Sequence, residues 1–161
     1  MLAEQRNKPQ FSDITFMVQN KPYYAHKIVV SLLSERFRTM LQAGLQESSK
    51  PGSCTVKIDE ISYECFTELM TYLYTGQFDC LDAIEDKQEL LETAIEFLRI
   101  ADVEVLDDVK IACELKLIAL LSVKCFQQVS EAADKYNADR LKDYCGWFER
   151  THCHSQLQWD K

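Results

Sequence analysis

The stretch from Phe11 to Met40 constrains the fold more than any other part of this chain. Apolar and polar side chains first alternate as in a half-buried β-strand, with Ile14, Phe16 and Val18 on the apolar side. Residues 20–22, Asn-Lys-Pro, predict a turn, and the residues after it predict a short return strand. The spacing then becomes helical, and the expected inward side chains are Ile28, Leu32, Leu33, Phe37, Met40 and Leu41. A hairpin that leads straight into two helices is typical of a scaffold.

The middle of the chain predicts another strand and a well-marked helix. Residues 54–59 alternate as a strand, and Ser62 is a suitable N-cap for the helix that follows. Gly76 is a natural C-cap, and residues 77–80 have the pattern of a last short strand. The helix is expected to bury one apolar stripe, made of Phe66, Leu69, Met70 and Leu73.

The second half predicts helices only. Amphipathic patterns cover residues 87–101, 107–121 and 139–148, and another segment opens at Ser122 and is broken at Asn137. In the helix at 107–121 the expected buried face is Ile111, Leu115, Ile118 and Leu121. The last two segments are expected to bury Phe126, Val129, Ala133, Leu141, Cys145 and Phe148. Strands that come early and helices that dominate late indicate an α+β domain with a helical appendage.

Composition excludes several classes of function. The chain has 161 residues, 47% of them hydrophobic, which suffices for one globular domain. Of its net charge of -8, residues 79–108 alone carry -9, from eleven acidic and two basic residues. This segment is either an acidic face for a basic partner or the solvated side of helices, and we favour the second interpretation. Either way, the charge argues against nucleic-acid binding.

Seven cysteines occur singly, without any CxxC pair, so a reducing compartment, cytoplasmic or nuclear, is expected. The polar N-terminus is unlike a signal peptide, and no apolar run approaches the roughly 20 residues that span a bilayer. We find no phosphate-binding loop, nucleophile elbow or HExxH pattern. His26 is expected to be a hydrogen-bonded structural residue, and His152-Cys153-His154 is too compact for zinc, so neither cofactor, metal nor catalysis is expected. A metal-dependent enzyme that uses this tail cluster is kept as an alternative, to be tested by metal analysis.

Several segments in the same order resemble a known family. They are SDITFMV at 12–18, YAHKIVV at 24–30, SERFRTML at 34–41, MTYLYTGQF at 70–78 and ELLETAIEFLRIADVEVL at 89–106. Together they resemble a BTB (POZ) domain, and AADKYNADRLKDYCGWF at 132–148 resembles the start of a BACK domain. The resemblance implies a small mixed β-sheet capped by a helical cluster, followed by a short helical BACK-like extension. The implied division is a disordered segment at 1–10, a BTB domain at 11–121 and the extension at 122–161.

Within the family, the chain looks most like the BTB region of ankyrin-repeat BTB proteins. Ten mostly polar residues precede Phe11, where many members carry an amphipathic helix that exchanges between the subunits of a dimer. We therefore expect either a monomer or a dimer without that exchange.

The resemblance implies a function in protein interaction. BTB adaptors of cullin-3 ubiquitin ligases carry a hydrophobic-X-Glu motif after the SxxFxxM helix, and here Leu45 and Glu47 fall at its positions, supported by Phe37 and Met40. The predicted function is a self-associating substrate adaptor for a cullin-3 ligase, with the substrate bound outside this chain. The alternative is a BTB scaffold in a transcriptional or cytoskeletal complex without cullin.

The resemblance also points to Asp13 and Lys27, which match positions of a charged pocket at the dimer seam of the family. The alternative, which we favour, is a local salt bridge that fixes the first strand to the next helix.

Overall fold

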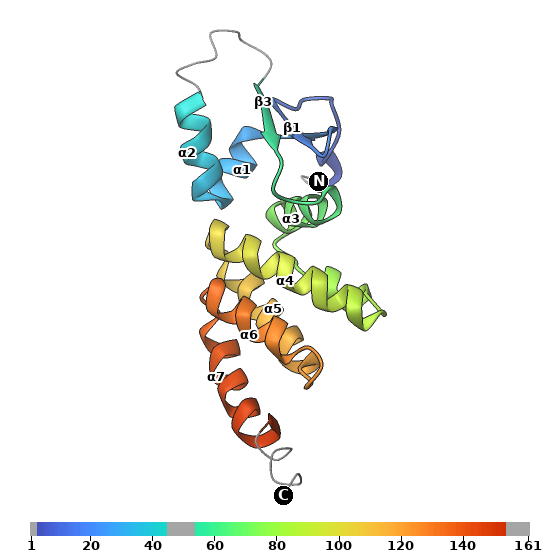
Figure 1. The fold of residues 1–161 in the computed structure, drawn as a ribbon. Coiled ribbons are helices and arrows are strands. Elements are labelled where there is room, and N and C mark those ends of the chain that lie inside the picture. Colours follow the sequence, from blue (N-terminus) through green and yellow to red (C-terminus); the bar gives the residue numbers. More distant parts are fainter. Residues whose placement is uncertain (1–2, 45–53, 154–161) are drawn as a thin grey trace, which may run out of the picture. The chain divides into compact units, whose positions relative to one another are not determined.

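The structure is a computed structural model that describes residues 3–44 and 54–153, without the side chains of Leu33 and Cys153. It divides into two compact units, Met1–Cys80 and Leu81–Lys161, each of which is described by itself (Figure 1). The first unit contains the sheet and three helices. Its elements are β1 (Ile14–Val18), β2 (Lys21–Ala25), α1 (Lys27–Leu33), α2 (Glu35–Gly44), β3 (Cys54–Ile58) and α3 (Tyr63–Thr75).

The three strands of the first unit form a mixed sheet in the order β2-β1-β3. β1 pairs with β2 in antiparallel and with β3 in parallel orientation. The predicted alternation in β1 is confirmed, since Ile14, Phe16 and Val18 are buried. The expected turn at 20–22 is wrong by one residue: Gln19 and Asn20 form it, both with positive φ, and Lys21 already pairs with Val18. Pro22 lies in the edge strand β2, where its missing N–H removes no hydrogen bond between strands.

The core of the first unit is aromatic and lies between the sheet and α3. The ring of Phe16 packs 5.4 Å from that of Phe37 and 5.2 Å from that of Phe66. α3 is as predicted: Ser62 accepts a hydrogen bond from the N–H of Cys65, and Gly76 ends the helix with a φ of 72°. Its expected stripe is buried in full: Phe66, Leu69, Met70 and Leu73.

The prediction of which side of α1 is buried is wrong. Ile28 and Leu32 were expected to be inside, but they are exposed, while Val29 and Val30 are buried. The seven-residue sequence KIVVSLL is apolar on more than one side, so periodicity alone could not decide which side faces the sheet.

The segment before β1 was expected to be disordered, but its described part is tied to the sheet. After a short 3-10 turn at Ala3–Gln5, the N–H of Asn7 donates to the carbonyl of Tyr24 at 3.0 Å. The N–H of Tyr24 donates in return to Oδ1 of Asn7 at 3.1 Å. Asn7 thus occupies the edge of β2 at Tyr24, which limits pairing of that edge with another chain.

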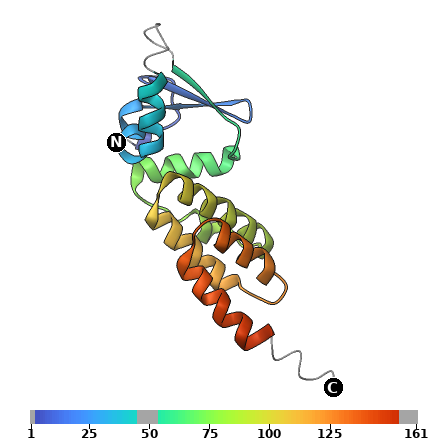
Figure 2. The same cartoon turned by 60° about the vertical axis from the view of Figure 1, so that its left-hand side comes forward.

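The second unit is helical. Its main helices are α4 (Lys87–Glu104), α5 (Asp107–Leu120), α6 (Phe126–Lys135) and α7 (Asp139–Phe148). α4 and α5 lie side by side as one hairpin, and α6 and α7 form another (Figure 2). Shorter helical turns occupy Cys80–Ala83 and Glu149–Cys153, so the strand expected at 77–80 is not formed.

Two helices of this unit depart from their predicted limits or faces. α4 runs three residues past Ala101, to Glu104, and ends at Val105 in the left-handed conformation. The face expected to be buried in α5 is wrong at Ile111 and Leu115, which are exposed, while Ile118 and Leu121 are half-buried. The buried side chains of α5 are Val109, Cys113, Glu114 and Leu117. α6 and α7 agree with expectation, since Val129, Ala133, Leu141, Cys145 and Phe148 are buried, with Phe126 half-buried.

Candidate protein-interaction surfaces

Asp13 and Lys27 meet, but not as a pair of charged side chains. Oδ1 of Asp13 accepts a hydrogen bond from the main-chain N–H of Lys27 at 2.7 Å. Lys27 is the first residue of α1, where N–H groups have no partner within the helix. Asp13 therefore caps α1 from the strand side, which corrects the expected salt bridge. The charged pocket at a dimer seam stays a prediction.

The residues proposed to bind cullin-3 are only partly within the described chain. Leu45 and Glu47 lie outside the described residues, directly after the end of α2 at Gly44. Met40 is half-buried, and Phe37 is buried against Phe16. Phe37 can therefore hold α2 on the sheet, but in this structure it offers no surface to a partner.

His26 has the structural role that was expected. The hydroxyl oxygen of Tyr74 accepts the main-chain N–H of His26 at 3.0 Å and lies 2.8 Å from its Nδ1. Burial raises the pKa of the Tyr74 phenol, which stays protonated at neutral pH and can donate to Nδ1. The pair fastens the junction between β2 and α1 to the last turn of α3.

At the other end of the chain, the ring of His152 stacks on Phe148, with centroids 4.3 Å apart. Its Nδ1 lies 2.7 Å from the hydroxyl of Thr151. In the described residues, no three acidic, histidine or cysteine side chains are grouped as metal ligands would be. Likewise, no helix among them is both long and apolar enough to cross a bilayer.

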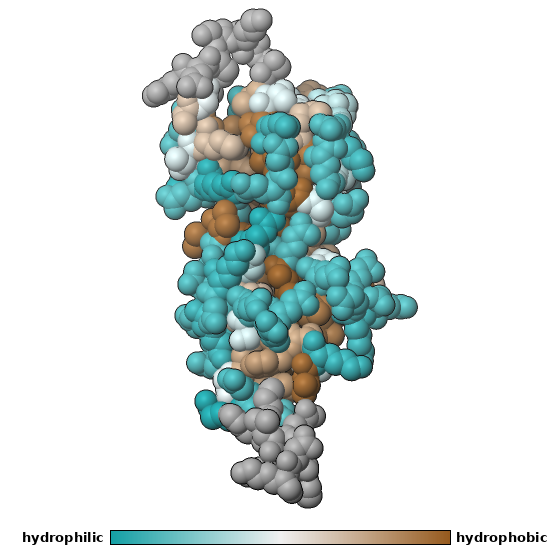
Figure 3. Space-filling model, in the orientation of Figure 1, coloured by the Kyte–Doolittle hydropathy of each residue, from teal (hydrophilic) through white to brown (hydrophobic). Residues whose placement is uncertain are grey.

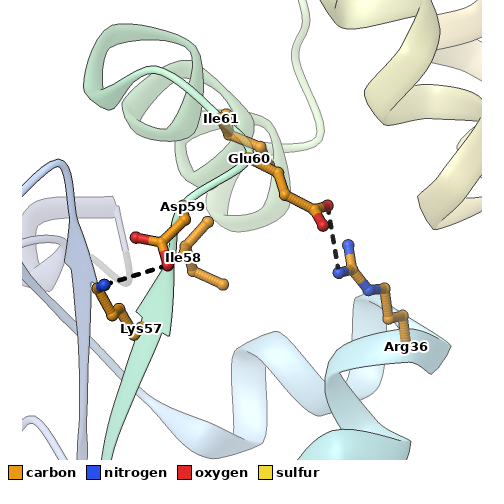
Figure 4. A pocket seen from close by; sticks show the side chains of 6 residues that line it. All are labelled: Arg36, Lys57, Ile58, Asp59, Glu60 and Ile61. Carbon is orange, nitrogen blue, oxygen red and sulfur yellow. Dashed lines mark ion pairs between the residues drawn. The ribbon is translucent and has the colours of Figure 1, made fainter.

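One shallow cavity of about 170 Å³ lies between α2 and the end of β3 (Figure 4). Two ion pairs cross its rim: Lys57 to Asp59 at 3.2 Å and Arg36 to Glu60 at 3.9 Å. Ligand pockets are larger, about 300 Å³ or more, and mostly apolar. This balanced, exposed set of charges does not resemble one.

Exposed apolar side chains are the most distinctive surface feature. In the first unit, Phe11, Ile28 and Leu32 are 78%, 67% and 74% exposed. Phe11 also has a φ of 64°, which is rare for a bulky residue. Figure 3 shows patches of hydrophobic surface that interrupt a mainly hydrophilic face. The signal that could have found Ile28 and Leu32 is a short helix with more apolar residues than one buried face can take.

Comparison with known proteins agrees with this fold. The sequence matches the BTB/POZ domain over residues 2–121. It is 27% identical over 146 residues to the Arabidopsis thaliana ARM repeat protein interacting with ABF2, covering 91% of this chain and 19% of that protein. It is 29% identical over 146 residues to Armadillo BTB Arabidopsis protein 1, covering 91% of this chain and 18% of that protein. The fold is similar to the BTB domain of zebrafish PATZ1, with a TM-score of 0.54 and 21% identity over 71% of this chain and 82% of that one.

The chain therefore belongs to the BTB/POZ family, whose members are protein-interaction modules. It spans about a fifth of the length of the two plant relatives. Both relatives are named for armadillo repeats, and the expected likeness to ankyrin-repeat BTB proteins stays a prediction.

Proposed function

We propose that this BTB domain self-associates through the exposed apolar side chains of Phe11 and of α1 and serves as an adaptor for a cullin-3 ubiquitin ligase. The observation that carries the first part is the exposure of Phe11, Ile28 and Leu32. Large apolar side chains grouped on one surface usually mark a protein interface, and we infer that these three group in this way.

The three side chains come from neighbouring parts of the chain. Asp13 is held to Lys27 at the start of α1, and its N–H donates to the carbonyl of Ala25 at 3.2 Å. Phe11 is thus two residues from the point where the chain meets α1, and Ile28 and Leu32 are one helical turn apart. Full burial of each such side chain contributes about 1.5–3 kcal/mol, and a symmetric contact that covers three per subunit would set this gain against a cost of association of about 4–15 kcal/mol.

Light scattering across a concentration series tests self-association. The double variant Ile28→Ser/Leu32→Ser is expected to be a monomer at concentrations where the wild type is a dimer. Val123→Ser, an exposed valine in the second unit, is the matched control and leaves the oligomeric state unchanged. A wild type that is monomeric at every concentration overturns this part of the proposal.

The cullin part rests on the resemblance and on the position of the hydrophobic-X-Glu motif. Leu45 would fill a pocket on the cullin, and Glu47 would accept hydrogen bonds beside it. Calorimetry with the cullin-3 N-terminal domain tests it: Leu45→Ala/Glu47→Ala is expected to lower the affinity at least tenfold, and Gln46→Ala to leave it unchanged. Equal affinities for wild type and the double variant mean that the adaptor mechanism is wrong. The substrate-binding region would lie in parts of a longer protein outside this chain.

A scaffold that works without cullin is the second candidate. The observation in its favour is the name of one plant relative, which records an interaction with ABF2. Under this alternative, the same apolar surface of α1 assembles the complex, and cullin-3 does not bind the wild type at all.

A further inference from the structure

Helix α5 has two apolar faces, and only one of them is covered. Val109, Cys113 and Leu117 are buried within the second unit. Ile111 and Leu115, on the other side, are 37% and 54% exposed. They lie one turn apart and form a single apolar stripe along the helix. A surface helix normally carries one apolar stripe, so the second, exposed stripe of α5 is not explained by packing within the chain.

The stripe has an acidic end. Asp107 and Asp108 are exposed in the first turn of α5, and Asp108 lies three residues before Ile111, on the same side of the helix. Neither carboxylate forms an ion pair with a described residue. Carboxylates favour the N-terminus of their own helix, which accounts for their presence there. That explanation does not extend to the exposed Ile111 and Leu115.

The positive charges of α5 are already compensated. Nζ of Lys110 lies 2.9 Å from Oδ1 of Asp102, and Nζ of Lys116 lies 2.5 Å from Oδ1 of Asp82. These are the only basic residues of the helix, so the exposed stripe carries negative charge and no uncompensated positive charge. Asp107 and Asp108 are the last two residues of the segment 79–108, which carries a net charge of -9.

We propose that the outward face of α5 binds a basic amphipathic helix of a partner protein. The apolar side of that helix would cover Ile111 and Leu115, and its lysines or arginines would meet Asp107 and Asp108. Ala119, which is exposed, and Ala112 are small and let a helix backbone approach closely. A second copy of this chain fits less well, because it would bring a surface of the same negative sign.

The proposal uses none of the residues of α1 or of the cullin motif, so its test does not depend on the proposed function. The probe is a fluorescein-labelled synthetic helix of leucine and lysine, with leucines on one side, titrated with the whole chain and followed by anisotropy. A scrambled peptide of the same composition and a leucine–glutamate analogue are the peptide controls. Specific, salt-sensitive binding of the leucine–lysine helix alone is expected.

Variants then locate the site. Ile111→Ser/Leu115→Ser is expected to weaken binding about tenfold or more, which corresponds to about 1.4 kcal/mol. Asp107→Asn/Asp108→Asn is expected to weaken it chiefly at low salt and to reduce its salt dependence. Val123→Ser is the control and binds as the wild type does. Circular dichroism verifies that each variant is folded.

Three results overturn the proposal. They are equal affinity for all variants, equal binding of the leucine–glutamate analogue, and self-association of the wild type that disappears in Ile111→Ser/Leu115→Ser. The last result would assign the face to a second copy of the chain.

Discussion

Oε2 of Glu114 accepts a hydrogen bond from the main-chain N–H of Leu141 at 2.8 Å, and both residues are buried. Leu141 is the third residue of α7, and the N-cap of that helix, Ala138, has no side-chain oxygen to offer. Glu114 thus does from α5 what an N-cap side chain does within one helix, which explains a buried carboxylate on an otherwise apolar face.

Removal of this acceptor should destabilise the second unit. Glu114→Ala leaves the N–H of Leu141 buried without a partner, so we expect a loss of about 2–3 kcal/mol in the free energy of unfolding. Glu114→Gln keeps an oxygen at the same position and should lose about 1 kcal/mol or less. Urea denaturation measures both, with the exposed Glu85→Ala as the control. Equal losses for the alanine and glutamine variants would show that the hydrogen bond is not the reason for this residue.

Tyr23 carries a buried polar group that, unlike the carboxylate of Glu114, has no hydrogen-bond partner among the described residues. Its side chain is fully buried. The ring itself packs well, 5.4 Å from Phe66. Tyr23→Phe keeps this packing and removes the unpaired hydroxyl, so it should stabilise the fold by about 1 kcal/mol.

Thermal unfolding checks the Tyr23 prediction. The control is Tyr74→Phe, which removes a hydroxyl that is bonded to His26 and should cost about 1 kcal/mol. If Tyr23→Phe is less stable than the wild type, an ordered water satisfies the hydroxyl, and the prediction is wrong.

Both phenols also predict how stability depends on alkaline pH. Burial is the main cause that raises the pKa of Tyr23 and of Tyr74 above the ordinary value, which is about 10. The folded state therefore holds these protons more tightly than the unfolded chain does. The contribution of the two protonated phenols to the free energy of unfolding is fully present below about pH 10 and is lost as the pH rises above that value.

Urea denaturation between about pH 8 and pH 11 measures this loss. The double variant Tyr23→Phe/Tyr74→Phe should lose less stability than the wild type above about pH 10. Burial also raises the pKa of the Cys145 thiol, which acts in the same direction from a lower pH. The comparison is therefore made between variants at each pH. Parallel curves for the two proteins would contradict the prediction.

Local sequence signals predicted those elements for which the residue pattern fits only one structure. α3 has a serine cap, one apolar stripe and a terminal glycine, and all three signals agree. β1 alternates strictly, and only one of its faces can be the core. The family motifs extend the prediction from single elements to the whole fold, because their order along the chain indicates a BTB domain without any knowledge of packing.

Tertiary packing decided what the sequence left open. In α1 and α5, apolar residues occupy two sides of the helix, and periodicity cannot tell which side meets the rest of the unit. The proposed interaction sites consist of Ile28 with Leu32 and of Ile111 with Leu115. For this reason, periodicity had placed these same residues in the core. The role of Asp13 as a cap for α1 also depends on a contact across the hairpin, which spacing does not reveal.

The end of α4 offers a last prediction about backbone strain. Val105 has a φ of 56°, a left-handed conformation that a β-branched residue rarely adopts. The N–H of the next residue, Leu106, donates to the carbonyl of Ala101 at 2.9 Å, as in a Schellman motif, which usually places glycine at the position of Val105. The side chain of Val105 is exposed, so its loss removes little burial. Val105→Gly should therefore stabilise the fold, by about 0.5–1 kcal/mol, through relief of strain.

Gly76 provides the reverse control for Val105. It ends α3 with a φ of 72°, and no heavy atom other than those of its chain neighbours lies within 4 Å of where a Cβ would be. Gly76→Ala therefore meets no steric clash with neighbouring groups, and its expected cost of about 1 kcal/mol is conformational alone. Val105→Gly removes a side chain and Gly76→Ala adds one, at equivalent positions at the ends of two helices. The two substitutions should therefore shift the urea midpoint in opposite directions. A shift in the same direction for both would mean that packing around the helix ends, not the sign of φ, determines their stability.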